Sequence, residues 1–232
     1  MNKLNIITSF YISKYNDSLD SSRSKELETC LLNNISSTFV EKIHLFVDDI
    51  DSLNRLNMLV NDTDKIVVID IGKKPKYYDY LKYIIDNLPN KICMITNSDI
   101  YIHQCDVKLI NELMTNKIVY SLTRYEHDMS PTLINNFGGS HDCYIFNSSF
   151  LDTSILQSQH VDFYQNIPGI ETRIISSFLN EGFKVYNPCY QIQIVHLHKT
   201  NLRNHGSWVG LHSYHDVDGF KKSVWCIPPT RL

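Results

Sequence analysis

The sequence lacks several features that would assign it to a common class of protein. It contains no CxxC pair, no His-Glu-x-x-His motif and no internal repeat. It also lacks an excess of basic residues, since its formal net charge is −3, whereas a nucleic-acid-binding domain usually presents a basic face. No apolar run approaches the roughly 20 residues that a membrane-spanning helix needs. We therefore expect neither a nucleic-acid partner nor an integral membrane segment.

Six cysteines are dispersed along the chain, and dispersed cysteines in a chain of this size usually stay reduced. Four of them, Cys30, Cys93, Cys143 and Cys189, lie in or beside apolar stretches and are expected to be small core residues. The first ten residues lack the apolar segment and cleavage site of a signal peptide. These features predict a cytoplasmic protein.

The 232 residues, 43% of them hydrophobic and 20% charged, fit one α/β domain that buries its core without disulfides. In the first half, strand-like runs alternate with amphipathic ones. Strands are predicted at residues 4–11, 42–47, 65–71 and 91–96, and helices at 21–34 and 77–88. This alternation predicts a mainly parallel sheet covered by helices, of Rossmann type.

The second half is less regular and predicts a smaller region beside that sheet. Strands are expected at residues 117–123, 143–147, 183–186 and 191–197, and a helix at 172–180. Parallel α/β sheets bind ligands beyond the carboxyl ends of their strands. The polar residues that end the predicted strands are therefore the candidates for a site: Thr8, Ser9, Asp48, Asp49, Asp70, Asn97, Ser98 and Asp99.

Asp99 follows the fourth strand directly, in the run Asn97-Ser98-Asp99. A carboxylate there can bind a hard divalent cation that also bridges a diphosphate. The alternative is a turn or helix-capping residue.

The run His196-Leu197-His198 places two imidazoles on one face of a strand, at a spacing that suits a metal site. The alternative is a surface pair on an edge strand. Further histidines follow at positions 205, 212 and 215, which leaves a metal-dependent hydrolase open as a function.

Two carboxylates in the second half lie beside glycine turns. Asp142 enters a predicted strand after the flexible turn Gly138-Gly139. Glu171 opens a helix after Pro168-Gly169, where it can cap the helix or act as a general base.

Basic residues in the first half also have two readings. Arg23 and Glu26, one helical turn apart, are expected to form an exposed ion pair of little energetic value. Lys73, Lys74 and Lys76 form either a solvated loop or a phosphate-attracting one.

Taken together, these segments resemble a family of GT-A-like glycosyltransferases with members in bacteria, eukaryotes and large DNA viruses. The resemblance covers residues 1–205 and rests on the order of its matching stretches. They are residues 15–23 with Glu26 and Asn33, 43–46, Gly72 with 77–78, 97–101, 121–124, 139–142, 168–173, 182–188, 196–198 and Arg203. The chain departs from the family pattern at Asn97, where the DxD motif has its first Asp, and at Glu171, where the pattern has Asp.

The resemblance implies transfer of a sugar from a nucleotide diphosphate donor, a UDP-sugar, to a glycan or glycoprotein acceptor. The absence of an internal repeat or linker predicts a single domain over residues 1–232, which we divide into a nucleotide-binding half (1–105), an acceptor and catalytic half (106–205) and a tail (206–232). The resemblance assigns Mn²⁺ or Mg²⁺ to Asp99 and His198. The site residues that it implies for the donor are Thr8, Ser9, Phe10, Arg23, Asp48, Lys74 and Asn97, and those for catalysis are Glu171 and Asp142. The alternatives are a nucleotide-sugar-binding protein without turnover and the histidine-based hydrolase.

Overall fold

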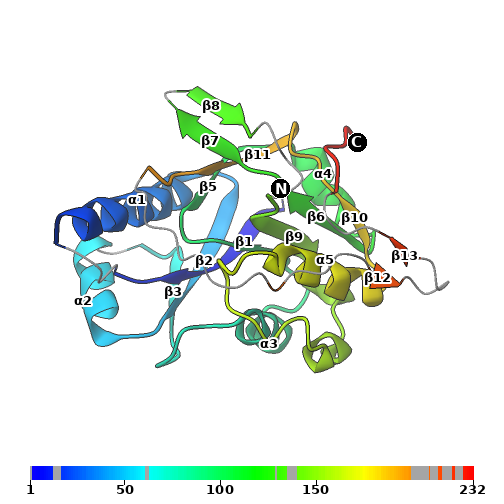
Figure 1. The fold of residues 1–232 in the computed structure, drawn as a ribbon, viewed down its shortest axis with the longest axis horizontal. Coiled ribbons are helices and arrows are strands. Elements are labelled where there is room, and N and C mark those ends of the chain that lie inside the picture. The colour runs from blue at the N-terminus through cyan, green and yellow to red at the C-terminus, as the bar shows by residue number, and fades with distance from the viewer. Residues whose placement is uncertain are drawn as a thin grey trace.

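The computed structural model describes residues 2–12, 17–60, 63–128, 130–134, 140–199, 209, 214–215, 221–222 and 227–232. Its main feature is a seven-stranded central sheet in the order β10-β6-β9-β4-β1-β2-β3 (Figure 1). The strands are β1 (Leu4–Phe10), β2 (Val40–Val47), β3 (Ile66–Asp70), β4 (Ile92–Thr96), β6 (Ile118–Leu122), β9 (Cys143–Asn147) and β10 (Lys184–Tyr186). All neighbouring pairs are parallel except those of β9, which is antiparallel to β4 and β6. The predicted α/β fold with a mainly parallel sheet is confirmed.

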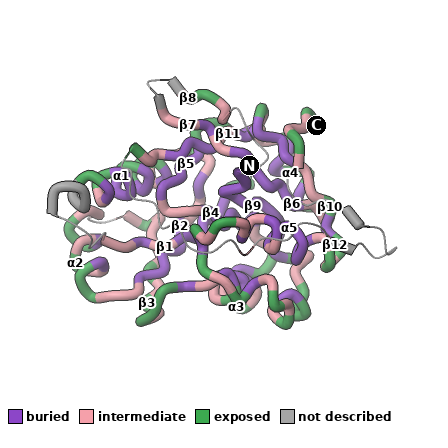
Figure 2. Tube along the Cα trace, in the orientation of Figure 1, coloured by how far each residue is buried: buried purple, intermediate pink, exposed green. Residues whose placement is uncertain are grey.

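Helices cover both faces of this sheet. On one face lie α1 (Asp17–Ser36), α2 (Ile50–Leu59) and α4 (Val107–Glu112), and on the other lie α3 (Tyr77–Asn87) and α5 (Ile170–Asn180). Because successive strand residues point to opposite faces, β1 gives Leu4 and Ile6 to the first core and Ile7 to the second. Figure 2 shows the resulting buried stretches along the central strands.

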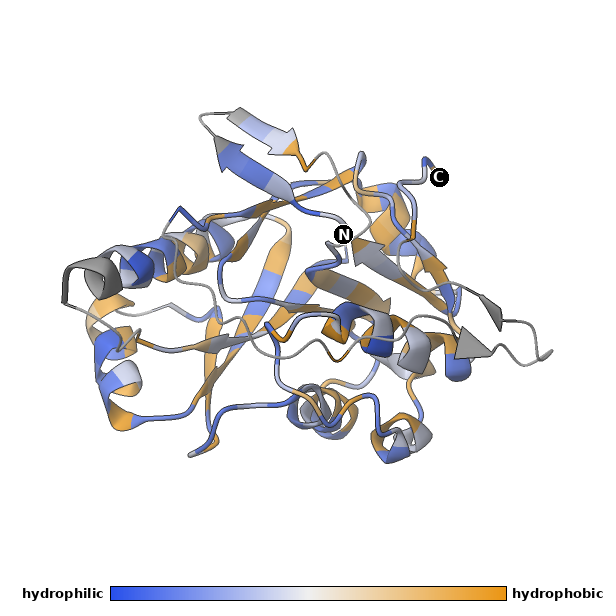
Figure 3. Cartoon of the chain, viewed as in Figure 1, coloured by the Kyte–Doolittle hydropathy of each residue, from blue (hydrophilic) through white to orange (hydrophobic). Residues whose placement is uncertain are grey.

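A smaller sheet lies over the α1 side, in the order β5-β11-β7-β8. Its strands are β5 (Ile100–Cys105), β11 (Ile192–His196), β7 (Tyr125–Asp128) and β8 (Ser130–Leu133). Ile102 of β5 and Ile194 of β11 join the same core as Leu4 and Ile6. Of the other two strands, β7 is mainly hydrophilic (Figure 3). Of the strands predicted for the second half of the chain, only β11 lies in this sheet, whereas β6, β9 and β10 belong to the central sheet.

Short elements complete the described part of the chain: η2 (Ser148–Phe150), η3 (Thr153–Gln157), β12 (Tyr214–His215) and β13 (Lys221–Lys222). The four cysteines expected in the core, and Cys105 as well, are buried free thiols. None of the described helices is both long enough and apolar enough to cross a bilayer.

Candidate functional site

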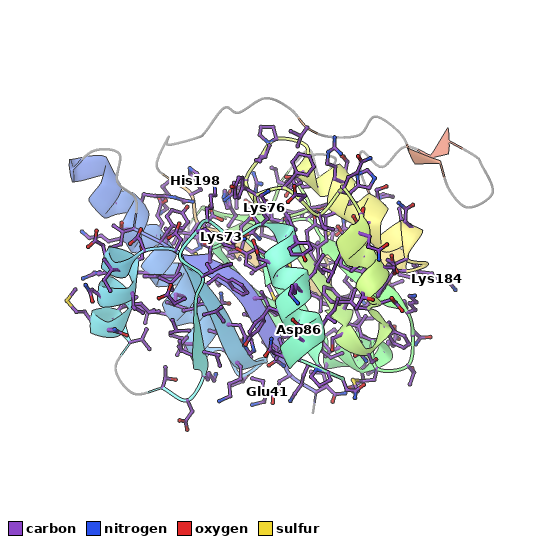
Figure 4. The ribbon with its side chains drawn as sticks, turned by 90° about the horizontal axis from the view of Figure 1, so that it is seen from below. Glu41, Lys73, Lys76, Asp86, Lys184 and His198 are labelled. Carbon is purple, nitrogen blue, oxygen red and sulfur yellow. The ribbon has the colours of Figure 1, made fainter. Side chains whose placement is uncertain are left out.

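Polar residues from distant parts of the chain meet at the carboxyl edge of the central sheet. The parallel strands contribute the residues that follow them, such as Asp48 after β2 and Asp99 after β4. The antiparallel β9 runs the other way, so it contributes the residue that precedes it, Asp142. In Figure 4, His198 lies at the same end of the molecule as Lys73 and Lys76, far from Glu41 and Asp86 at the opposite end.

Asp99 is a buried carboxylate at this edge that lies close to three basic side chains. Its Oδ2 lies 2.6 Å from Nη2 of Arg23, 3.2 Å from Nε2 of His196 and 3.4 Å from Nδ1 of His198. Oδ1 of Asp99 and Nε2 of His198 are buried with no partner. Asp99, His196 and His198, here called the Asp-His cluster, each offer a ligand atom, and these atoms lie within 4.8 Å of one another.

The electrostatics of the Asp-His cluster favour ionised groups in spite of burial. Burial alone would raise the pKa of Asp99, but hydrogen bonds from both histidines and the charge of Arg23 hold it well below 3.8. Burial has the opposite effect on a histidine and would lower the pKa of His196, but Asp99 and Glu126 raise this pKa to about 9. Asp99 is therefore a permanent anion at neutral pH.

This donor set fits a divalent metal ion that takes the place of the Nε2 proton of His196, because a histidine binds a metal only through a deprotonated ring nitrogen. One carboxylate and two imidazoles are common ligands of first-row transition metals. Asp99 Oδ1 and His198 Nε2 are buried without a hydrogen-bond partner, and each can offer a lone pair to a metal ion. Imidazole nitrogens suit Mn²⁺ better than Mg²⁺, which prefers oxygen ligands.

Arg23 does not form the exposed ion pair with Glu26 that the sequence predicted. The pair exists, with 2.9 Å between Nη1 and Oε2, but both side chains are buried, and Arg23 also reaches Asp99. The segment that follows β11 covers this turn of α1: Nη1 of Arg23 contacts the Leu197 carbonyl, and the backbone N–H of Lys199 donates to Glu26. The i,i+3 spacing predicted the ion pair, but it could not predict that both side chains are buried, because burial depends on the segment that packs over the helix.

His196 is also not on an edge strand, which excludes the surface-pair interpretation. It ends β11, which lies between β5 and β7, and it is buried. Its Nδ1 lies 3.0 Å from Oε2 of Glu126 on β7, while Nε2 faces Asp99. The structure thus brings both predicted histidines to Asp99.

Asp142 is held by three donors. Asn97 Nδ2 donates to its Oδ1 at 3.1 Å, and Ser140 Oγ and Arg124 Nη1 donate to its Oδ2 at 2.6 and 3.0 Å. This contact explains the departure from the DxD pattern, because an Asp at position 97 would place a second carboxylate against Asp142. Both carboxylate oxygens of Asp142 are therefore occupied by donors from within the protein.

Glu171 has a different environment. It lies in the first turn of α5, after Gly169 at φ 84°, and accepts hydrogen bonds from the backbone N–H groups of Gly169 and its own residue. Burial raises its pKa and the nearby charge of Asp142 raises it further, to about 7. A carboxylate with a pKa near neutrality is suited to general base catalysis.

The two aspartates after β2, Asp48 and Asp49, have different hydrogen-bond environments. Asp49 accepts the N–H of Ser52 at 2.7 Å and caps α2, whereas Asp48 has a buried Oδ1 without a partner. Thr8 of β1 also has a buried hydroxyl without a partner. Tyr11, which follows β1, lies near Asp48 and Asp99 and bonds to Arg23, and burial raises its pKa. These residues connect the end of β2 to the Asp-His cluster.

The other predicted donor residues lie at varying distances from this group. Ser9 Oγ is 2.9 Å from Ser98 Oγ, next to Asp99 in sequence. The Phe10 side chain is 3% exposed and packs in the core, so only its backbone can line a ligand. Lys74 is exposed on the β3–α3 loop, with Nζ 5.1 Å from the centre of the Tyr164 ring.

Sequence reasoning missed the roles of Tyr11, Arg124 and Glu126. Tyr11 is recognisable in retrospect as an aromatic residue directly after β1, and Arg124 belongs to a stretch that resembles the family. Glu126 had no signal, because its contact with His196 depends on the pairing of β7 with β11. Arg203 and the side chains of His205, His212 and His215 lie outside the described residues, so the hydrolase alternative is not tested by the structure.

No family model and no curated protein sequence matches this chain. Its fold is similar to that of Staphylococcus aureus TarS residues 1–349, solved with UDP-GlcNAc, with a TM-score of 0.56 and 12% identity over 89% of this chain and 62% of that one. A candidate nucleotide-diphospho-sugar transferase from Desulfovibrio desulfuricans G20 gives 0.49 and 8%, over 81% and 80% of the chains. A 4-diphosphocytidyl-2C-methyl-D-erythritol synthase from Anaerococcus prevotii DSM 20548 gives 0.48 and 11%, over 89% and 92%. At these identities the likeness concerns the fold.

Proposed function

We propose that the protein is a metal-dependent glycosyltransferase that moves a sugar from a UDP-linked donor to a hydroxyl group of a glycan or glycoprotein. The observation that carries this proposal is the Asp-His cluster, whose ligand atoms lie within 4.8 Å of one another at the carboxyl edge of the sheet. The fold shared with TarS, which was solved with UDP-GlcNAc, supports the choice of donor.

Asp99, His196 and His198 would hold the metal, which supplies positive charge to the diphosphate as it becomes the leaving group. Arg23, whose guanidinium lies 2.6 Å from Asp99, adds a second fixed positive charge beside that position. Thr8, Ser9 and Asp48 would bind the nucleoside. The unpartnered Oδ1 of Asp48 is suited to accept the ring N–H of uracil.

We assign the catalytic base to Glu171. Its carboxylate takes the proton of the acceptor hydroxyl while that oxygen bonds to the anomeric carbon. The bond from this carbon to the donor phosphate oxygen breaks, and its electron pair leaves with the diphosphate. Asp142, fixed by Asn97, Ser140 and Arg124, would instead accept hydrogen bonds from the sugar. The pKa of Glu171, raised to about 7, matches what a general base at this position needs.

The decisive experiment is a thermal-shift and calorimetric screen of nucleotide sugars with and without Mn²⁺, because a ligand that binds only the folded state raises its stability. Asp99→Ala should abolish metal-dependent binding of the donor, and Mn²⁺ should support binding better than Mg²⁺. Asp86→Ala is the matched control, since Asp86 pairs with Lys82 at the opposite end of the molecule (Figure 4). Donor affinity that is unchanged in Asp99→Ala with metal present would contradict the metal assignment.

A transfer assay distinguishes the remaining alternatives. Release of UDP together with a glycosylated acceptor identifies a transferase, and binding without turnover identifies a nucleotide-sugar-binding protein. Zinc retained through purification, with no affinity for nucleotides, would instead indicate the histidine-based hydrolase.

A further inference from the structure

Glu126 links two parts of the site that it does not itself form. It lies on β7, and its side chain is 36% exposed. Its Oε2 lies 3.0 Å from Nδ1 of His196, and its Oε1 accepts a hydrogen bond from Nε of Arg124 at 2.7 Å. Each carboxylate oxygen thus has its own partner.

The contact with His196 fixes which ring nitrogen enters the Asp-His cluster. With Nδ1 bonded to Glu126, Nε2 is directed at Asp99, 3.2 Å away. A carboxylate behind a histidine sets the ring orientation and raises the basicity of the opposite nitrogen, which makes it a better metal ligand.

The contact with Arg124 extends the same link to Asp142. Nη1 of Arg124 donates to Oδ2 of Asp142 at 3.0 Å, while its Nε is held by Glu126. Glu126 therefore contacts both His196, which belongs to the Asp-His cluster, and Arg124, which holds Asp142.

We propose that Glu126 is a positioning residue that orients His196 for metal binding and ties the Asp-His cluster to Asp142. This inference rests on the metal-binding part of the proposed function. Two N–H donors converge on this side chain, so it needs two acceptor oxygens. A glutamine offers one acceptor and one NH₂ group, and can satisfy only one of the two partners.

The test is a titration of the protein with Mn²⁺ alone, in which electron paramagnetic resonance measures the free ion. Loss of such an outer contact typically weakens metal binding by about 10–100-fold. We expect that range for Glu126→Gln and at least as large a loss for Glu126→Ala. Glu126→Asp, which keeps both acceptor oxygens, should bind Mn²⁺ more tightly than Glu126→Ala.

The matched control is Glu41→Gln. Glu41 also accepts two hydrogen bonds, from Asn5 Nδ2 and Lys91 Nζ, and its side chain is 39% exposed, but it lies at the opposite end of the molecule (Figure 4). This variant should bind Mn²⁺ like the wild type, with a similar melting temperature to Glu126→Gln.

Wild-type Mn²⁺ affinity in both Glu126→Gln and Glu126→Ala would overturn the inference, as would an equal loss in Glu41→Gln. A wild-type protein that binds no Mn²⁺ would also overturn it. Because the titration contains neither donor nor acceptor, its result is independent of whether the protein transfers sugar, which the transfer assay decides separately.

Discussion

Replacing Glu171 by glutamine should make the protein more stable at alkaline pH and much less active. The folded protein holds the Glu171 proton with a pKa of about 7, against an ordinary value of 4.5. The contribution of Glu171 to the free energy of unfolding is therefore fully present below pH 4.5, and it is lost as the pH rises through 7. At 1.36 kcal/mol per pKa unit, ionisation of buried Glu171 costs on the order of 3 kcal/mol.

Glutamine has the same size and does not ionise, so Glu171→Gln removes this cost. At pH 8.5 the variant should melt roughly 5–10 °C above the wild type, given 2–4 °C per kcal/mol for a chain of this size. At pH 4.5 the two proteins should melt at similar temperatures. Calorimetry at both pH values measures the difference. Glu181→Gln, at the far end of α5, is the control and should show no such pH dependence.

Sugar transfer by the same variant should fall at least a hundredfold, because a positioned base contributes roughly 10²–10⁴-fold. In the wild type, kcat/KM should rise with pH through an apparent pKa near 7 as Glu171 loses its proton. A variant that is less stable at both pH values but retains transfer would refute this reasoning and return Glu171 to the role of a helix cap.

Two further predictions concern other polar residues. Asp48→Asn should weaken UDP more than CDP in calorimetric titrations, because cytosine lacks the ring N–H that the carboxylate would accept; equal weakening would place base recognition elsewhere. His44 and His141 are buried, which lowers the pKa of each to about 4, so stability should fall by up to about 1.4 kcal/mol per pH unit for each as the pH drops from 6.5 toward 4. Urea denaturation from pH 7 to 5 measures this slope, and His44→Gln should reduce it; an unchanged slope would mean that His44 is protonated in the folded protein.

The central sheet was predictable because parallel strands covered on both faces are continuous apolar runs. All seven central strands, along with α1, α3 and α5, were anticipated to within a few residues. Helix α2 was missed, although Leu53, Leu56 and Leu59 recur along it at helical spacing. The β7–β8 hairpin was missed because the hydrophilic β7 has no strand-like alternation.

The candidate site was predictable only where the backbone fixes it. Asp99 follows the end of β4, and His196 ends β11, with His198 two residues beyond the strand. The partners of these residues depend on strand order: the pairing of β11 with β7 supplies Glu126, and the antiparallel β9 supplies Asp142. Such neighbours are far apart in sequence, so no local pattern reveals them.

Acidic and basic side chains alternate without interruption across this edge of the sheet. In order of contact they are Glu26, Arg23, Asp99, His196, Glu126, Arg124 and Asp142. Removing one interior member leaves two like charges as neighbours, whereas removing an adjacent acid and base together preserves the alternation. Substitutions here should therefore be tolerated in pairs. A selection for suppressors of a Glu126 defect should recover a neutral residue at Arg124 more readily than a change at a distant site.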